Sequence, residues 1–98
     1  MRLQYAIWKD QFAAKIAAKH NVQTEEVEDV LFSKPLTRKI RKGRIKGEHV
    51  YVAYGQTGSG RYLAVFFIYK RNNSALPISA RDMTRAERNY YNEHKEKG

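Results

Sequence analysis

The sequence contains no cysteine, and only two prolines occur among its 98 residues. The absence of cysteine excludes disulfide bonds, thiolate zinc sites and thiol nucleophiles, and it is compatible with a reducing compartment. A long apolar run is also missing, because Gln4 and Lys9 interrupt the opening residues MRLQYAIWKDQ. These residues therefore fit neither a secretory signal nor a membrane span, and we expect a cytoplasmic protein.

Acidic side chains are scarce: 10 Asp and Glu stand against 19 Lys and Arg, which gives a formal net charge of +9. A protein with this surplus repels itself, so the excess charge favours a polyanionic partner such as nucleic acid. A membrane surface would instead require a basic amphipathic helix or a lipidation motif, and the sequence shows neither.

The positive charge is concentrated in one segment. Residues 1–33 carry 4 basic and 5 acidic side chains, residues 34–48 carry 7 and 1, and residues 49–98 carry 8 and 4. The segment KPLTRKIRKGRIKG is a solvated basic loop on the simplest interpretation. Its uncompensated cations nevertheless favour an RNA or an acidic protein as counter-charge. The residues expected to bind RNA there are Lys39, Arg41, Lys42 and Arg44.

Three stretches have the pattern of helices. The first is expected to begin with Asp10 as its N-cap and to end at Asn21, a residue that tolerates the left-handed conformation. The second starts at Thr24, has acidic residues in its first turn, and is ended by Pro35. The third begins at Thr84, where the sequence TRAE is typical of a capping box.

Strands are predicted from apolar alternation at residues 3–7, 50–54, 62–69 and 75–80. The run 62–69 is apolar or aromatic throughout, so we place it centrally and covered on both faces. Pro77 cannot donate a ladder hydrogen bond, which implies an edge position or a bulge. We therefore expect one α+β domain over residues 1–98, with an antiparallel sheet of about four strands, two N-terminal helices, one C-terminal helix and a disordered tail at about 95–98.

The segment GQTGSGR, residues 55–61, superficially resembles a phosphate-binding loop. A P-loop requires GxxxxGK[ST] between a strand and a helix, whereas Arg61 and Tyr62 follow Gly60 here and a strand is expected next. A hairpin turn is the favoured interpretation, because glycine supplies the positive φ that such turns need.

The three histidines, His20, His49 and His94, lie on different predicted elements without HxxxH or HExxH spacing, so we expect no metal site and no cofactor. His20 follows Lys19 at a helix end and is the best candidate for a general acid or base. The other interpretation, a partly exposed histidine at a helix terminus, has equal support from the sequence.

The stretch ISARDMTRAERNYY is the richest in candidate residues. Arg81 precedes a helix start, a position that suits phosphate oxygens. Arg85 and Arg88 are three residues apart and share a helical face, which Tyr91 extends and from which it could stack on a base. The alternative is that Arg88 pairs with acidic neighbours while the tyrosines complete the core.

The chemistry available to these residues favours RNA over DNA. No pair of carboxylates resembling a hydrolase dyad lies near them in the sequence. Cleavage of a phosphodiester would then proceed without metal. Arginines would stabilise the pentacoordinate phosphorus, and His, Lys or Tyr would move protons around the 2′-hydroxyl that only RNA has.

Six segments carry a family resemblance: Trp8, KHNV at 19–22, EVEDVLF at 26–32, YGQT at 54–57, GRYL at 60–63 and ISARDMTRAER at 78–88. Together they resemble the BrnT family of type II toxins from Trp8 to Tyr91. The most specific parts are the KH-x-V turn and the SAR-x-x-T-x-x-ER-x-x-Y tail. The resemblance implies a RelE-like fold and a metal-independent endoribonuclease that inhibits translation. It also implies a BrnA-type ribbon-helix-helix antitoxin that neutralises the toxin and represses the shared operon.

Carried over by motif, the resemblance implies these functional positions: Lys19, His20, Arg81, Glu87, Arg88 and Tyr91, with Trp8 nearby. Arg61, Arg85 and Trp8 are further candidates for RNA contacts. The expected partners are the antitoxin, an RNA substrate and operator DNA bound through the antitoxin complex, but no membrane. Two other functions stay open: a basic RNA-binding module without catalysis, and a protein whose cations dock an acidic antitoxin segment.

Overall fold

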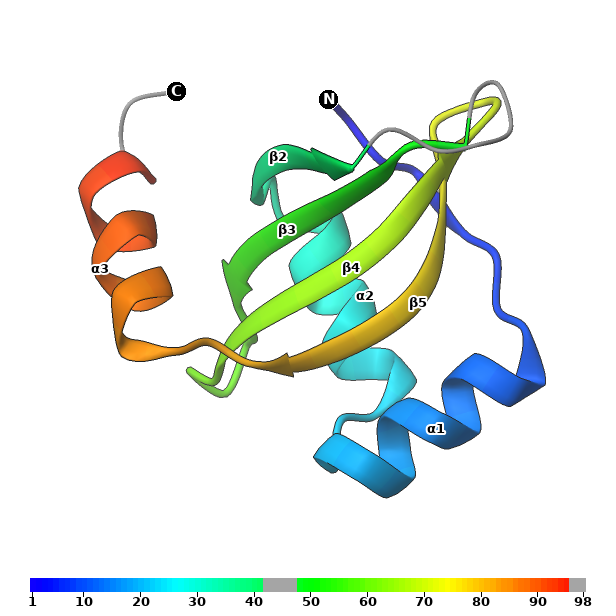
Figure 1. The fold of residues 1–98 in the computed structure, drawn as a ribbon, viewed down its shortest axis with the longest axis horizontal. Coiled ribbons are helices and arrows are strands. Elements are labelled where there is room, and N and C mark those ends of the chain that lie inside the picture. Colours follow the sequence, from blue (N-terminus) through cyan, green and yellow to red (C-terminus); the bar gives the residue numbers. More distant parts are fainter. Residues whose placement is uncertain (42–47, 96–98) are drawn as a thin grey trace.

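The computed structural model describes residues 1–41 and 48–95 (Figure 1). Its elements are β1 (Tyr5–Ala6), α1 (Asp10–His20), α2 (Thr24–Phe32), β2 (Leu36–Arg41), β3 (Val50–Gln56), β4 (Tyr62–Lys70), β5 (Ser74–Asp82) and α3 (Arg85–His94). The predicted α+β class, with two helices before the main strands and one after, is confirmed. Lys42 and Arg44, two of the expected RNA contacts, lie outside the described residues, as do residues 96–98 of the tail expected to be disordered.

The sheet has five strands in the order β1-β5-β4-β3-β2. Its central strand is β4, as predicted, but two other expectations were wrong. β1 runs parallel to β5, so the sheet is mixed. The segment interpreted as a basic loop contributes β2, which pairs antiparallel with β3. The reason is that an edge strand tolerates cations, which solvate there and discourage further strand pairing.

The helix ends follow local signals. Asn21 has φ 52°, so the left-handed terminator is confirmed. The Thr84–Glu87 capping box is also confirmed. One predicted cap was wrong by one residue. Asp10 lies inside the first turn of α1, after Lys9 at the cap position. α2 begins at Thr24, as predicted, and the preceding Gln23 is its N-cap and forms a capping box with Glu26.

Two irregular features were predicted for the sheet, a hairpin turn after β3 and either a bulge or an edge position at Pro77. In the β3–β4 hairpin, Thr57 N–H donates to the Arg61 carbonyl at 2.8 Å and Gly60 has φ 96°, which confirms a hairpin turn. Around Pro77 the register of β5 on β4 shifts between Phe66 and Phe67, so the bulge is confirmed. The edge position is not, because β5 lies between β1 and β4.

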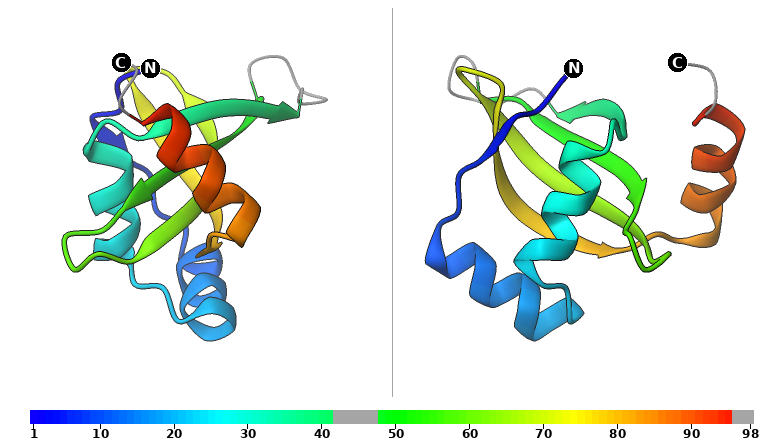
Figure 2. Two further views of the ribbon diagram at one scale, coloured as in Figure 1. Left: turned by 90° about the vertical axis from the view of Figure 1, so that its left-hand side faces the viewer. Right: turned by 180° about the vertical axis from the view of Figure 1, so that it is seen from behind.

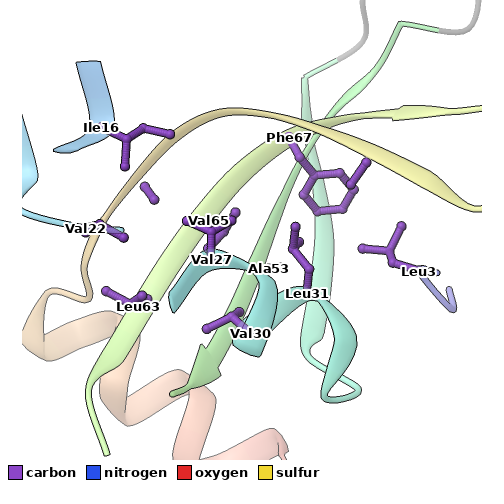
Figure 3. Packing of buried hydrophobic residues seen from close by; sticks show 12 residues of the cluster. Leu3, Ile16, Val22, Val27, Val30, Leu31, Ala53, Leu63, Val65 and Phe67 are labelled. Atoms are coloured by element: carbon purple, nitrogen blue, oxygen red, sulfur yellow. The ribbon is translucent and has the colours of Figure 1, made fainter. Parts of the chain in front are cut away.

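One face of the sheet is covered by α1 and α2 (Figure 2). Figure 3 shows the main core there. Its members are Leu3, Ile16, Val22, Val27, Val30, Leu31, Ala53, Leu63, Val65, Phe67, Ala75 and Ala80. Alternate residues of each strand point to this face, which is why the apolar run of β4 contributes Leu63, Val65 and Phe67.

The opposite face, called the open face below, carries a smaller cluster of Val52, Tyr54, Ala64 and Met83. Tyr90 and Tyr91 of α3 pack against it, but α3, described over its whole length, has no fully buried residue. α3 stands away from α1 and α2, beside the ends of β3 and β4 (Figure 1). Within residues 1–41 and 48–95, no helix is long and apolar enough to cross a membrane.

Candidate functional site

Arginines from two different strands reach the open face. Arg38 of β2 is paired with Val52, and Arg81 of β5 is paired with Ala64. Val52 and Ala64 both belong to the cluster on the open face, and residues directly opposite on neighbouring strands share a face. The sheet therefore presents Arg38 and Arg81 on the same side, away from α1 and α2.

The inner stripe of α3 completes this surface. Glu87, Tyr90, Tyr91 and His94 recur at the i, i+3, i+4, i+7 spacing that places residues on one helical face. The Tyr90 ring meets Tyr54 edge-on at 6.1 Å, and the Tyr91 ring meets Tyr62 edge-on at 6.1 Å. These contacts orient the whole stripe toward the sheet.

Arg81 and Glu87 form a bidentate ion pair that ties the end of β5 to the start of α3. Arg81 Nη1 and Nη2 donate to the two Glu87 carboxylate oxygens at 2.7 and 3.0 Å. Glu87 also accepts from the Thr84 N–H at 2.8 Å. The hydrogen bond from Arg81 holds the pKa of Glu87 below its ordinary value, and the same bond raises the pKa of Arg81. A phosphate that binds Arg81 must therefore compete with Glu87.

Tyr54 of β3 belongs to the cluster on the open face and has only 7% of its surface exposed. Burial raises the pKa of its phenol, and the negative charge of Glu87 raises it further. Tyr54 is thus held as a neutral phenol, a form that can donate a hydrogen bond to an anionic oxygen.

Two arginines on the open face are stacked on tyrosines rather than paired with carboxylates. Arg38 Cζ lies 4.7 Å from the centre of the Tyr90 ring, and Arg88 Cζ lies 4.2 Å from that of Tyr62. Among the residues that the structure describes, neither takes part in an ion pair. One half of the alternative interpretation, an Arg88 ion pair, is thus not observed, whereas the tyrosines do pack against the sheet. Arg85 is exposed on the same helix.

The open face also contains a hollow of about 450 Å³. It is lined by Ile40, Val50, Phe66, Ile78 and Ser79. Arg81 Cζ lies 5.1 Å from the centre of the Phe66 ring at its margin. An apolar hollow bordered by a guanidinium can accept a planar base whose phosphate remains in solvent.

Lys19 and His20 lie elsewhere, at the corner between α1 and α2. Arg61 Nη2 donates to the His20 carbonyl at 3.1 Å, and Arg61 also binds Asp82 at 2.7 Å. Asp82 follows Arg81 on β5, and successive side chains of a strand point to opposite faces. The structure therefore brings His20 to the helix-covered side of β5 and Arg81 to the open face. It does not bring these two residues together, and a catalytic role for Lys19 and His20 stays a prediction.

Three more candidates, Arg61, Trp8 and Lys39, fall outside the open-face cluster. Arg61 directs its guanidinium to protein groups, namely the carbonyls of residues 20 and 21 and the carboxylates of residues 26 and 82. Trp8 Nε1 donates to Glu28 at 2.8 Å and packs beside the main core. Lys39 is paired with Tyr51, whose ring packs against the main core. The backbone of Arg41 is paired with Val50. Their binding of RNA also stays a prediction.

Three residues of the open face were missed by the sequence interpretation: Arg38, Tyr54 and His94. For His94 a signal was present, since it continues the spacing of Glu87 and Tyr91 by one helical turn. Arg38 had none of comparable strength, because the strand that orients it was not predicted. In the described part of the chain, no three His, Asp or Glu side chains come close enough together to hold a metal ion.

Fold and site define a small basic α+β domain with arginines and tyrosines on one sheet face, a class suited to a polyanionic ligand. A model of the family described as "Ribonuclease toxin, BrnT, of type II toxin-antitoxin system" matches residues 8–87. The chain therefore belongs to the BrnT toxin family, and the resemblance found in the sequence is confirmed. Membership of a type II toxin–antitoxin family implies an antitoxin partner.

A solved structure supports the fold. The crystal structure of the Brucella abortus ribonuclease toxin BrnT aligns with a TM-score of 0.58 at 18% sequence identity, over 84% of this chain and 100% of that one. No curated protein matches the sequence significantly. The family match ends at Glu87, so most of α3, including His94, lies beyond it.

We expect the Arg81–Glu87 pair to stabilise the fold in a pH-dependent manner. The folded pKa of Glu87 lies below its ordinary value of 4.5, so the stabilisation is complete above pH 4.5 and is lost as the pH falls through the folded value. Glu87→Gln should lower the free energy of unfolding by about 1 kcal/mol at pH 7, a modest amount because the pair is partly solvated. Urea unfolding of both proteins across the acid range measures this, and the gap between them should close as the pH falls. Glu93→Gln, exposed on the same helix, is the control. A gap that stays constant with pH would contradict the expectation.

Proposed function

We propose that this protein is a metal-independent endoribonuclease toxin whose open face binds and cleaves RNA, inhibiting translation. The observation that carries the proposal is a pair of arginines stacked on tyrosines, Arg38 on Tyr90 and Arg88 on Tyr62, neither of which forms an ion pair with another described residue. Guanidinium groups held on aromatic rings present their donors to solvent in a fixed orientation, which suits the phosphates of a single strand. The family description as a ribonuclease toxin supports the same activity.

The proposed chemistry uses the substrate's own nucleophile. The 2′-hydroxyl of RNA attacks the adjacent phosphorus, and negative charge accumulates on the phosphoryl oxygens. Arg38 and Arg88 would stabilise that charge, and Arg85 would contact flanking phosphates. Tyr91 would present its ring to a base, while Glu87 would hold Arg81 until a phosphate displaces it. Lys19 and His20 are proposed as separate contacts for RNA that passes the end of β5.

The decisive assay is cleavage of a short RNA by the purified protein in EDTA. We expect products with 2′,3′-cyclic phosphate and 5′-hydroxyl ends, and no cleavage of the DNA of the same sequence. Arg38→Ala and Arg88→Ala should each slow cleavage by about 10²-fold, the usual cost of removing one donor to a developing anion. Lys15→Ala, which removes an exposed cation from α1, is the matched control. Loss of all activity in EDTA, or full activity of both arginine variants, would refute the proposal.

A second candidate is a non-catalytic RNA-binding module. It is favoured by the engagement of both terminal nitrogens of Arg81 with Glu87, since that guanidinium is not free in the structure. This candidate requires RNA affinity that falls steeply with salt, no cleavage, and no growth arrest when the protein is expressed.

We further propose that the antitoxin is a BrnA-type ribbon-helix-helix protein and that the complex binds operator DNA in the cytoplasm. The net charge of +9 supports a partner with an acidic toxin-binding segment. Expression of the toxin alone should arrest growth, and co-expression with the product of the neighbouring gene should restore it.

A further inference from the structure

His94, near the C-terminal end of α3, makes a hydrogen bond that defines which of its ring nitrogens carries a proton. Nδ1 lies 2.7 Å from the Tyr90 carbonyl oxygen. A carbonyl oxygen can only accept, so Nδ1 must be the donor. The neutral imidazole is therefore the Nδ1–H tautomer, and the lone pair is on Nε2. This is the form in which a histidine can take up a proton at Nε2.

The imidazole is also held in place by packing. The His94 ring stacks on Tyr90 with 4.1 Å between ring centres and 29° between planes. Tyr90 in turn meets the buried Tyr54 ring of β3 edge-on. A histidine fixed by one hydrogen bond and one stacking contact loses little orientational freedom when a substrate binds, which is what proton transfer requires.

A cation that can hold a phosphate lies over the same tyrosine. Arg38 reaches the Tyr90 ring from β2, with 4.7 Å from Cζ to the ring centre. The Tyr90 ring therefore contacts both the His94 imidazole of α3 and the Arg38 guanidinium of β2. Arg81 is less suited to this role, because Glu87 occupies both of its terminal nitrogens at the other end of the stripe, about 10 Å away along the helix axis.

We propose that His94 is the general base of the cleavage reaction and that Arg38, which contacts the same tyrosine ring, binds a phosphate of the RNA strand. This rests on the ribonuclease function proposed above. Nε2 of His94 takes the proton from the 2′-hydroxyl, and the 2′-oxygen forms a bond to phosphorus. The bond from phosphorus to the 5′-oxygen breaks, and that oxygen takes a proton from solvent water. The products are a 2′,3′-cyclic phosphate and a 5′-hydroxyl, with no change of oxidation state.

A purely structural role for His94 is the competing explanation, because its Nδ1 bond also ties the ring to the backbone of α3. His94→Asn separates the two roles. The Asn Nδ2 can take the place of Nδ1 as donor to the Tyr90 carbonyl, but asparagine has no group equivalent to Nε2. Asn92→Ala, at an exposed position on the same helix, is the matched control.

The test compares cleavage of a short RNA with binding of the same sequence carrying 2′-O-methyl groups, which cannot be cleaved by this route. We expect His94→Asn to bind the 2′-O-methyl RNA as the wild type does and to cleave RNA about 10²-fold more slowly. His94→Ala should regain activity when free imidazole is added, and Asn92→Ala should behave as the wild type.

Each result has one meaning. If the wild type cleaves and His94→Asn cleaves within about twofold of it, His94 is not the base, although the ribonuclease function stands. If a slow His94→Ala variant gains nothing from imidazole, the role of His94 is structural and the inference is overturned. If the wild type itself does not cleave RNA, the proposed function fails and the inference fails with it.

Discussion

Replacing Arg61 by alanine should lower the free energy of unfolding by about 2–3 kcal/mol, the cost of several charge-assisted hydrogen bonds in a partly solvated position. The guanidinium joins three separate parts of the fold. It donates to the His20 and Asn21 carbonyls at the α1–α2 corner, to Glu26 of α2 and to Asp82 of β5. The hydrogen bond from Arg61 lowers the pKa of Asp82, so this carboxylate remains charged.

Arg61→Lys should be nearly as unstable as Arg61→Ala, because one ammonium group cannot replace a planar fork that reaches two carbonyls and two carboxylates. Urea unfolding at pH 7 measures the effect, with Arg71→Ala in the exposed β4–β5 turn as the control. The result bears on function as well. If Arg61→Lys were as stable as the wild type but bound RNA weakly, the internal role would be wrong and the RNA contact expected from the sequence would be right.

Gly55→Ala should cost about 1–3 kcal/mol of stability, because it inserts a methyl group where α2 packs directly on β3. A Cβ at position 55 would lie 2.9 Å from Val30 Cγ1. Val30 is fully buried and cannot turn into open space. The absence of a side chain at Gly55 is therefore what lets the helix approach the strand.

A second substitution tests this explanation. Val30→Ala alone should destabilise the protein, since it leaves a cavity in the core. Combined with Gly55→Ala, it should cost clearly less than the sum of the two single changes, because the new methyl group occupies the vacated space. Gly58→Ala is the control, since its Cβ would make only an ordinary contact of 3.5 Å with Asp29. Strict additivity in the double variant would show that the clash with Val30 is not the cause.

The two faces of the sheet have different roles, and the substitutions at Arg61, Gly55 and Val30 test the covered face. Gly55 and Arg61 join α1 and α2 to the sheet on the covered face. Arg38, Tyr54 and the inner stripe of α3 lie on the open face, where stacked arginines are available to a ligand. Variants of the covered face should therefore change stability, and variants of Arg38, Arg88 and His94 should change RNA cleavage.

Local features of the chain were predictable because they depend on neighbours a few residues away. The left-handed Asn21, the Thr84–Glu87 capping box and the glycine-rich hairpin each involve residues at most six positions apart. The family also followed from the sequence, since the KH-x-V motif and the SAR-x-x-T-x-x-E part of the second motif lie within the matched range. β2 was not predictable in this way, because an edge strand rich in cations has no local pattern that separates it from a solvated loop.

The sequence by itself determined the family, the helices, the central strands and the excess of positive charge. Only the tertiary structure decided which charged residues act together. Neighbours such as Arg81 and Asp82 point to opposite faces, while residues as distant as Arg38 and Tyr90 come into contact. The physical reason is that the direction of a side chain depends on strand register and helix docking. Both are set by contacts between segments far apart in the chain.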